Sequence, residues 1–186
     1  MFKIGFFFVI ILGYVILFKD FRFKDPVNIH KMTRKQWIRV LLLGLASAGS
    51  IYFAYLLLNP ILDMNRIKED LVNRLGITKT GFIFVGIYVA FGNSFLEEYF
   101  FRGFIFFHLP RKWGYIYGPL LFSSYHIPMI IFWFSPLLVF VCFLGLWAIG
   151  MVFHKVNEKN GTIWASWVIH VCADIMIILI GFTLFY

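Results

Sequence analysis

Apolar residues gather in six long runs along this chain, and short polar segments separate them. A helix needs about 20 mostly apolar residues to cross a membrane, and the six runs lie near or above that length. They cover Phe2–Phe18, Val40–Leu62, Gly81–Leu109, Trp113–Phe134, Pro136–His154 and 162–186. The pattern predicts an all-α fold: a polytopic transmembrane helical bundle of about six spans, in one membrane-embedded domain of residues 1–186.

Two of the polar segments carry structural predictions of their own. Asp63–Thr80 has mixed charge, and its part Ile67–Leu75 fits a short amphipathic helix lying at the membrane surface. Lys155–Gly161 is expected to be a tight polar turn. Small residues between positions 44 and 50 give the second span a face suited to close helix packing.

The composition agrees with a protein that lives in the bilayer. Hydrophobic residues make up 61% of the chain and charged residues only 14%, whereas soluble domains have about 45–50% apolar and about 25% charged residues. The only two cysteines, Cys142 and Cys172, lie inside apolar runs without a CxxC spacing. We expect them to be packing residues and not a metal or redox site.

The net charge of +8 follows from membrane topology and does not indicate a nucleic-acid partner. If both termini lie outside, eleven of the 17 Lys and Arg residues fall in the three inside loops and five in outside segments. The positive-inside rule therefore favours an N-out, C-out multi-pass protein of the plasma membrane. If Phe2–Phe18 does not span fully, the N-terminus lies inside and the other spans are unchanged.

Within the spans, three ionisable residues stand close together in the third run. An ionisable group at membrane depth costs at least ~2.5–3.5 kcal/mol on insertion scales, so each needs a partner or a function. Glu98 and Arg102 are four residues apart, which predicts a buried ion pair on one helix face. Glu97 is rotated by about 100° from Glu98 and shares its face with Asn93 instead, so it lacks that partner.

The later spans contain three further polar groups at membrane depth. His126 follows Phe122 by four residues, and Asp174 follows His170 by four, so each pair shares a helix face. These groups and Glu97 are expected to meet in the bundle interior and not to face lipid. By contrast, His108 and His154 lie at span ends beside basic residues and are expected to be interfacial, while His30 lies in a loop.

Such a cluster is compatible with more than one function. A carboxylate and an imidazole could activate water for attack on a carbonyl, while the second imidazole and its neighbour stabilise the oxyanion. Glu97, His126 and His170 could instead hold a metal such as zinc. A structural polar network, or a proton or ion path, is the third possibility.

Three motifs together resemble a known family. Glu97-Glu98-x-x-x-Arg102-Gly103, Phe122-x-x-x-His126 and His170-x-x-x-Asp174 are similar to the motifs of the CPBP (Abi) intramembrane proteases. That family includes type II CAAX prenyl endopeptidases and bacteriocin-processing or self-immunity proteins. The resemblance covers about residues 81–181 and implies an all-helical glutamic endopeptidase. It implies that Glu97 is the general base and that His126 helps to activate water. It also implies that His170 and Asp174 stabilise the oxyanion, with Glu98, Arg102 and Phe122 as supporting residues.

The resemblance also sets expectations about substrate and cofactor. It implies a membrane-anchored or lipidated peptide or protein as substrate, in contact with the lipid bilayer, and no cofactor, with zinc as the alternative. Asp174 departs from the pattern, because prenyl-protein proteases have Asn there, and the chain is short for that group. A non-proteolytic membrane scaffold, a bacteriocin self-immunity protein and a proton-coupled transporter stay open as alternatives.

Overall fold

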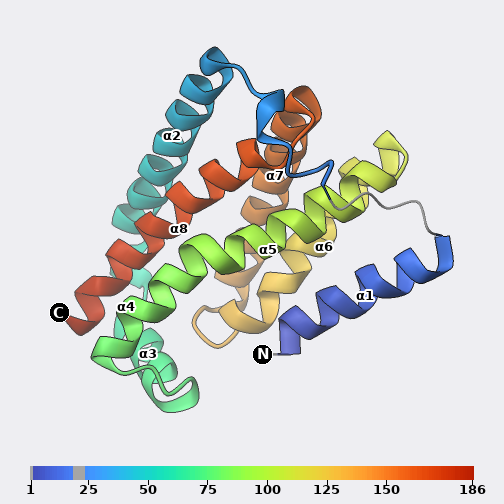
Figure 1. Cartoon of the computed structure of the whole chain (residues 1–186). Helices are drawn as coiled ribbons and strands as arrows, with labels where there is room; N and C mark the ends of the chain where they lie inside the picture. Colours follow the sequence, from blue (N-terminus) through green and yellow to red (C-terminus); the bar gives the residue numbers. More distant parts are fainter. Residues whose placement is uncertain (1, 19–23) are drawn as a thin grey trace.

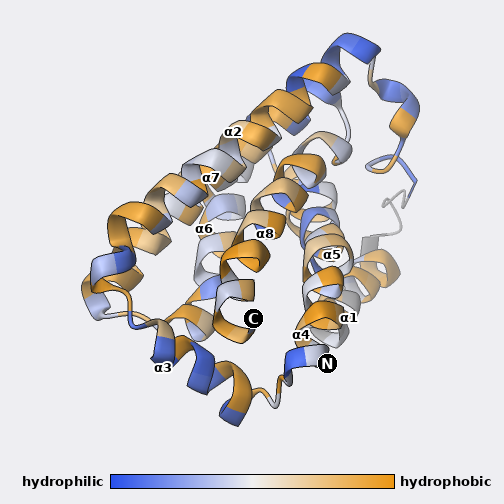
Figure 2. Cartoon of the chain, turned by 90° about the vertical axis from the view of Figure 1, so that its left-hand side faces the viewer, coloured by the Kyte–Doolittle hydropathy of each residue, from blue (hydrophilic) through white to orange (hydrophobic). Residues whose placement is uncertain are grey.

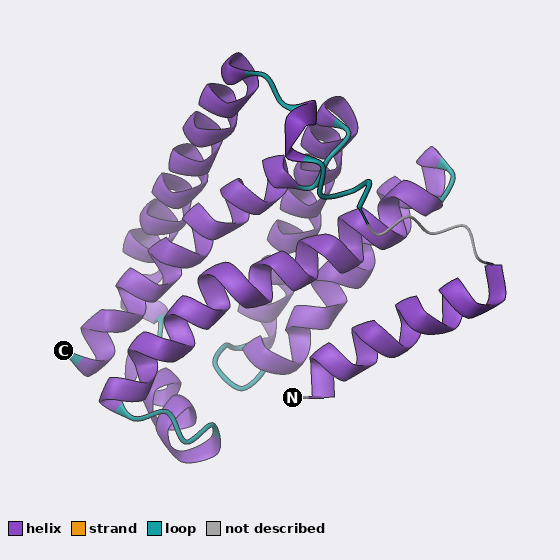
Figure 3. Ribbon diagram, viewed as in Figure 1, coloured by secondary structure: helices purple, strands orange, loops and turns teal. Residues whose placement is uncertain are grey.

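The computed structural model describes residues 2–18 and 24–186, and in this part of the chain all regular structure is helical (Figure 3). The all-α prediction is thus confirmed. The main helices are α1 (Phe2–Phe18), α2 (Arg34–Leu58), α3 (Met64–Glu69), α4 (Lys79–Ile87), α5 (Ser94–Glu98), α6 (Arg111–Ile130), α7 (Pro136–Asn160) and α8 (Trp164–Phe185). Short 3₁₀ turns cover Ile29–Lys31 and Asn59–Ile61, and π-helical segments cover Asp70–Arg74, Tyr88–Asn93 and Tyr99–Phe106.

The predicted third span is one continuous helix that mixes α and π geometry. It runs through α4, Tyr88–Asn93, α5 and Tyr99–Phe106 without a break. In its π-helical turns the backbone hydrogen bonds reach five residues back, whereas those of an α-helix reach four. For example, the backbone N–H of Phe107 bonds to the carbonyl of Arg102. π turns inside helices are frequent at functional sites, and here they lie on both sides of α5, which carries Glu97 and Glu98.

Helices α1 and α2 lie on opposite sides of the molecule, with α5 and α8 between them (Figure 1). Helix α2 packs along α8, and α1 packs against Tyr99–Phe106. Phe7 of α1 stacks on Phe100 with ring centroids 4.1 Å apart. The centre of the bundle is therefore built from the chain after residue 79, and the first two long helices flank it.

The polar segments predicted on one side of the membrane meet at one end of the bundle. The ammonium group of Lys31 donates to the carbonyl of Gly161 at 2.9 Å, and Arg111 pairs with Glu158 at 2.5 Å. We call this the basic end. Figure 2 shows hydrophilic residues at the start of α2, which belongs to the same end.

The segments predicted on the other side meet at the opposite end. The indole of Trp133 donates to Asp70 Oδ2 at 2.7 Å, and the Tyr186 hydroxyl donates to the Lys79 carbonyl at 3.1 Å. A hydrogen bond from Arg74 holds the pKa of the Asp70 carboxyl below its usual range, which favours the ionised acceptor that Trp133 binds. Both groups of loops therefore gather as the charge pattern predicts.

Four of the six predicted spans are long and apolar enough to cross a membrane. Among the described residues these are Arg34–Ile61, Lys79–Phe106, Pro136–Asn160 and Trp164–Phe185. Helix α1 has 17 residues, and α6 has 20 with Pro119 and Pro128 inside it. That α1 and α6 also cross the membrane stays a prediction.

Two sequence predictions about the fifth span are wrong. Lys155–Gly161 is not a turn, because α7 continues to Asn160 and ends at Gly161, which adopts the left-handed φ of 64° that favours glycine at this position. His154 is consequently not interfacial. It is 0% exposed because its ring packs against Phe106, with ring centroids 4.2 Å apart, and against Gly118. Almost two helical turns of α7 follow it.

Other boundaries shift for local reasons. Helix α2 begins at Arg34 and not at Val40, because Thr33 and Gln36 form a reciprocal capping box. The amphipathic helix predicted over Ile67–Leu75 is present and begins earlier, where Asp63 caps the backbone N–H of Arg66. It continues through Asp70–Arg74 as a π-helical turn.

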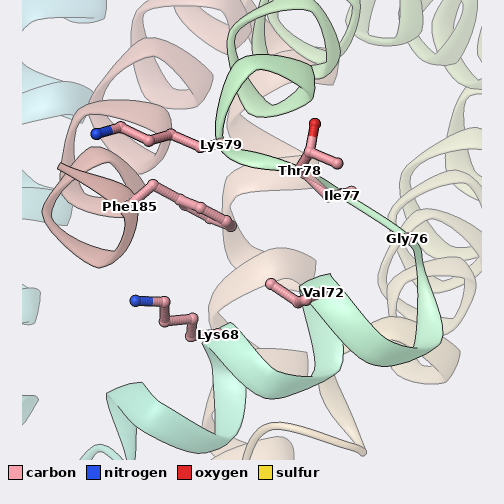
Figure 4. Close-up of a pocket in the computed structure, with 7 residues that line it drawn as sticks. All are labelled: Lys68, Val72, Gly76, Ile77, Thr78, Lys79 and Phe185. Carbon is pink, nitrogen blue, oxygen red and sulfur yellow. The ribbon is translucent and has the colours of Figure 1, made fainter.

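A cavity of about 350 Å³ lies where this amphipathic helix meets the bundle. Figure 4 shows Lys68 and Lys79 on the same side of the cavity, with Phe185 between them. The other lining residues are Val72, Gly76, Ile77 and Thr78. No carboxylate, imidazole or thiol lines it, so it is separate from the predicted site.

The close packing of α2 on α8 gives a test of the fold. A side chain at Gly44 would place its Cβ 2.7 Å from Cys172 Sγ, whereas no atom lies within 4 Å of the same position at Gly49. We expect Gly44→Leu to lower stability by about 1–3 kcal/mol through overpacking. Gly49→Leu, on the same helix, should leave it unchanged. Thermal unfolding in detergent measures both, and equal midpoints would contradict this packing.

Candidate active site

The structure brings together the four residues predicted to carry chemistry. They come from three helices: Glu97 from α5, His126 from α6, and His170 and Asp174 from α8. Glu97 Oε2 lies 3.6 Å from His126 Nε2 and 3.9 Å from His170 Nε2. His170 Nε2 also lies 3.8 Å from Asp174 Oδ1. Two carboxylates and two imidazoles thus face one small region inside the bundle.

Glu97 is buried, and one of its two oxygens is open. Its side chain is 2% exposed, and Oε1 accepts a hydrogen bond from Asn93 Nδ2 at 2.7 Å. Among the described residues no donor lies within hydrogen-bonding geometry of Oε2, although the Tyr125 hydroxyl interacts with the Glu97 carboxylate. A buried acceptor without a donor is costly, so this oxygen is suited to bind a water molecule or a proton.

The ring of His126 is oriented so that its second nitrogen meets this open oxygen. Nδ1 lies 2.7 Å from the carbonyl oxygen of Phe122, one turn earlier in α6. A carbonyl only accepts, so Nδ1 carries the hydrogen, and in the neutral imidazole Nε2 is an acceptor. Two acceptors, Nε2 and Glu97 Oε2, then face each other at 3.6 Å. This is an arrangement that a water molecule can satisfy by donating a hydrogen to each.

Glu98 differs from Glu97 in that both of its carboxylate oxygens have hydrogen-bond partners. Arg102 Nη1 donates to Oε1 at 2.9 Å, and both side chains are 0% exposed. The predicted buried ion pair is therefore present. Glu98 Oε1 also lies 2.9 Å from His170 Nδ1, and the Ser166 hydroxyl donates to Oε2. Glu98 thus holds the ring of His170, a contact that helical spacing did not predict.

Aromatic rings enclose the guanidinium group of Arg102. Its central carbon lies 4.1 Å from the ring centroid of Phe122 and 4.9 Å from that of Phe153. The same Phe122 ring lies 4.6 Å from that of His126. Phe122 is 2% exposed, so it is a packed platform between the ion pair and His126.

Comparison with known proteins agrees with this arrangement. The family model for type II CAAX prenyl endopeptidase Rce1-like proteins matches residues 79–176, more than half of the chain. The chain belongs to this Rce1-like family. The match begins at the first residue of α4 and includes all four converging residues, which confirms the resemblance seen in the motifs. No curated protein and no solved structure matches the chain.

Family membership and the apolar helices together make this a membrane protein of a protease family. Helices α1 and α2 lie outside the matched range, so the match covers the central part of the bundle. Asn93, which the sequence placed on the face of Glu97, also falls inside the match and contacts that carboxylate.

Two buried polar residues of the site were missed from the sequence. Ser166 and Asn157 are both 0% exposed and contact each other, and the Ser166 hydroxyl donates to Glu98. Ser166 lies four residues before His170, just as His170 lies four residues before Asp174, so the three share one helix face. The same spacing, followed backwards along the chain, would have identified Ser166. Asn157 was hidden because its segment was predicted to be a turn.

The donor set proposed for zinc does not fit a metal site. Within residues 2–18 and 24–186, no three or more His, Cys, Asp or Glu side chains are placed to hold one ion. No chemical step is therefore assigned to a metal below.

The ion pair predicts which arginine the fold requires. Arg102→Met leaves Glu98 buried without its cation, and breaking a buried pair from one side costs about 3–5 kcal/mol. We expect a large fall in the thermal unfolding midpoint in detergent. Arg111→Met removes an exposed pair and should change it little. A stable but inactive Arg102→Met would instead place Arg102 in the catalytic machinery.

Proposed function

We propose that this protein is an intramembrane endopeptidase that hydrolyses a peptide bond of a membrane-anchored or lipidated peptide or protein. The observation that carries the proposal is the open Oε2 of buried Glu97, which faces the Nε2 of His126 at 3.6 Å. Membership of a prenyl endopeptidase family supports the same reaction class. The non-proteolytic alternatives gain no support from a site that retains both acidic and both imidazole groups.

The proposed first step uses one water molecule held between these two groups. Glu97 accepts a proton from the water as the oxygen attacks the carbonyl carbon of the substrate, with His126 orienting the water. A C–O bond forms, and the carbonyl becomes a tetrahedral oxyanion. Glu97 then returns the proton to the departing amine as the C–N bond breaks, which leaves a carboxylic acid and an amine as products.

His170 is proposed to stabilise the oxyanion. With Nδ1 donating to Glu98, its Nε2 is the nitrogen directed at the reaction region. In the imidazolium form both ring nitrogens carry hydrogen, and Nε2–H would then be a positioned donor that lowers the energy of the developing negative charge. An ionised Asp174 has no hydrogen to donate. Asp174 Oδ1 lies 3.8 Å from His170 Nε2, a position suited to orienting the imidazole. An orienting role can therefore explain why Asp replaces the Asn of prenyl-protein proteases at this position.

The membrane setting suggests how a substrate is presented. Glu97 lies beyond the midpoint of the helix Lys79–Phe106, on the half nearer the basic end. By the positive-inside rule that end faces the cytoplasm of a plasma-membrane protein with both termini outside. We propose a cytoplasmic substrate, with a prenylated or otherwise lipidated C-terminus as the class to test first.

Replacing the proposed base tests the mechanism directly. Glu97→Gln keeps the size and the Asn93 contact but removes the proton acceptor, so kcat should fall by roughly 10²–10⁴-fold. Glu69→Gln, on exposed α3, should keep full activity. Cleavage of a farnesylated peptide in proteoliposomes, followed by mass spectrometry, measures both variants. Full activity of Glu97→Gln would overturn the assignment, and no cleavage by the wild type would favour a scaffold role.

Metal dependence is tested separately. We expect cleavage to survive exhaustive treatment with o-phenanthroline, because no step above uses a metal. Elemental analysis of the purified protein accompanies the assay. Activity lost with the chelator and restored by zinc alone would establish the zinc-dependent version of the reaction.

A further inference from the structure

A chain of buried hydrogen bonds leads from the basic end of the bundle to His170. Asn157 Nδ2 donates to Ser166 Oγ at 2.6 Å, and the backbone N–H of Ser166 donates to Asn157 Oδ1 at 3.0 Å. The Ser166 hydroxyl donates to Glu98 Oε2, and Glu98 Oε1 meets His170 Nδ1 at 2.9 Å. Asn157, Ser166 and Glu98 are 0% exposed and His170 is 7% exposed, so water does not compete for these bonds.

The direction of these bonds follows from the donors available. A serine hydroxyl has one hydrogen and two acceptor lone pairs. Asn157 Nδ2 occupies a lone pair of Ser166 Oγ, and the contact from Oγ to Glu98 is shorter than the 3.1 Å contact to the carbonyl of Ile163. The hydroxyl hydrogen is therefore directed at Glu98, while the Asn157 amide occupies a lone pair of the same oxygen and holds Ser166 in place.

The consequence at Glu98 is a carboxylate that cannot rotate. Ser166 holds Oε2, while Arg102 and His170 share Oε1. Without the Ser166 contact, Oε2 would be a buried acceptor without a partner, and rotation of the carboxylate would relieve that cost. Any such rotation would move the oxygen that fixes His170 Nδ1 and would tilt Nε2 away from Glu97.

The first members of the chain are themselves held by the turn between α7 and α8. Gly161 ends α7, and both Thr162 Oγ1 and the backbone N–H of Ile163 donate to the carbonyl of Pro26 at 2.9 Å. These contacts fix the first turn of α8, which contains Ser166. Asn157 and Ser166 therefore face each other across a turn that is held in place by its two hydrogen bonds to the Pro26 carbonyl.

We propose that Ser166 and Asn157 are positioning residues that act through Glu98 to fix the ring orientation of His170 and the hydrogen bond from its Nδ1. The effect that we expect on catalysis rests on the proposed function, whereas the effect that we expect on the orientation of His170 does not. A purely structural contact between α7 and α8 is the competing explanation. Ser123 offers the comparison, because it is equally buried but donates only to the Pro119 carbonyl of its own helix, at 2.8 Å.

The kinetic experiment compares three variants. Ser166→Ala should lower kcat by roughly 10–100-fold, by analogy with the loss of a partner that orients a metal-bound histidine, with KM changed less than about twofold. Ser166→Thr restores the hydroxyl and should recover most of the activity. Ser123→Ala should match the wild type. If Ser166→Ala fails to fold, Ser166→Cys, which keeps the volume and only a weak donor, takes its place and should be slower than the wild type.

A second measurement does not depend on proteolysis. With ¹⁵N-labelled histidine, and His170→Gln to assign the signal, NMR in detergent should show the Nδ1 hydrogen of wild-type His170 fixed in its bond to Glu98. Ser166→Ala should shift or exchange-broaden this signal, and Ser123→Ala should not. If the wild type cleaves no peptide, the proposed function fails and this spectrum alone decides the inference. An unchanged His170 signal in Ser166→Ala, or equal kinetic losses in Ser166→Ala and Ser123→Ala, would overturn it.

Discussion

The burial of the Glu98–Arg102 pair is the interaction on which the rest of this structure depends. Neither charge is accessible to solvent, and each would be strongly unfavourable alone at this depth. The bundle therefore supplies further partners from other helices: rings from Phe122 and Phe153 around the guanidinium group, and donors from Ser166 and His170 on the carboxylate. Helices α5, α6, α7 and α8 are brought into one arrangement by satisfying a single ion pair.

This arrangement separates two neighbouring glutamates into different chemical roles. Glu98 has both oxygens occupied and acts as a fixed anchor, whereas Glu97 keeps one oxygen without a donor beside two imidazoles. Environments that differentiate adjacent carboxylates are a general way of assigning acid–base roles. Glu98 also orients part of the cluster around Glu97, because the histidine that it holds is the same one that faces Glu97.

The flanking parts of the chain serve the centre in different ways. Helix α1 covers Phe100 and Phe101 on the outside of the third span. The segment before α2 ties down the α7–α8 turn through Lys31 and Pro26. Both lie outside the range matched by the Rce1-like family model, and neither contributes an ionisable side chain to the cluster around Glu97. The family match and the cluster around Glu97 are thus contained in α4–α8, and the N-terminal part packs against them.

Short-range patterns in the sequence determined the helical fold, four of the spans, the Glu98–Arg102 pair and the group of residues around Glu97. Each depends on helical periodicity, on the cost of burying charge or on family motifs, all of which can be recognised in single segments without knowing how the helices pack. Only the tertiary structure decided that His170 binds Glu98, that Asn157 and Ser166 complete the network, and that His154 is buried. Glu98 and His170 are 72 residues apart in the chain. Their contact depends on how α5 and α8 are rotated against each other, and packing of the whole bundle sets that rotation.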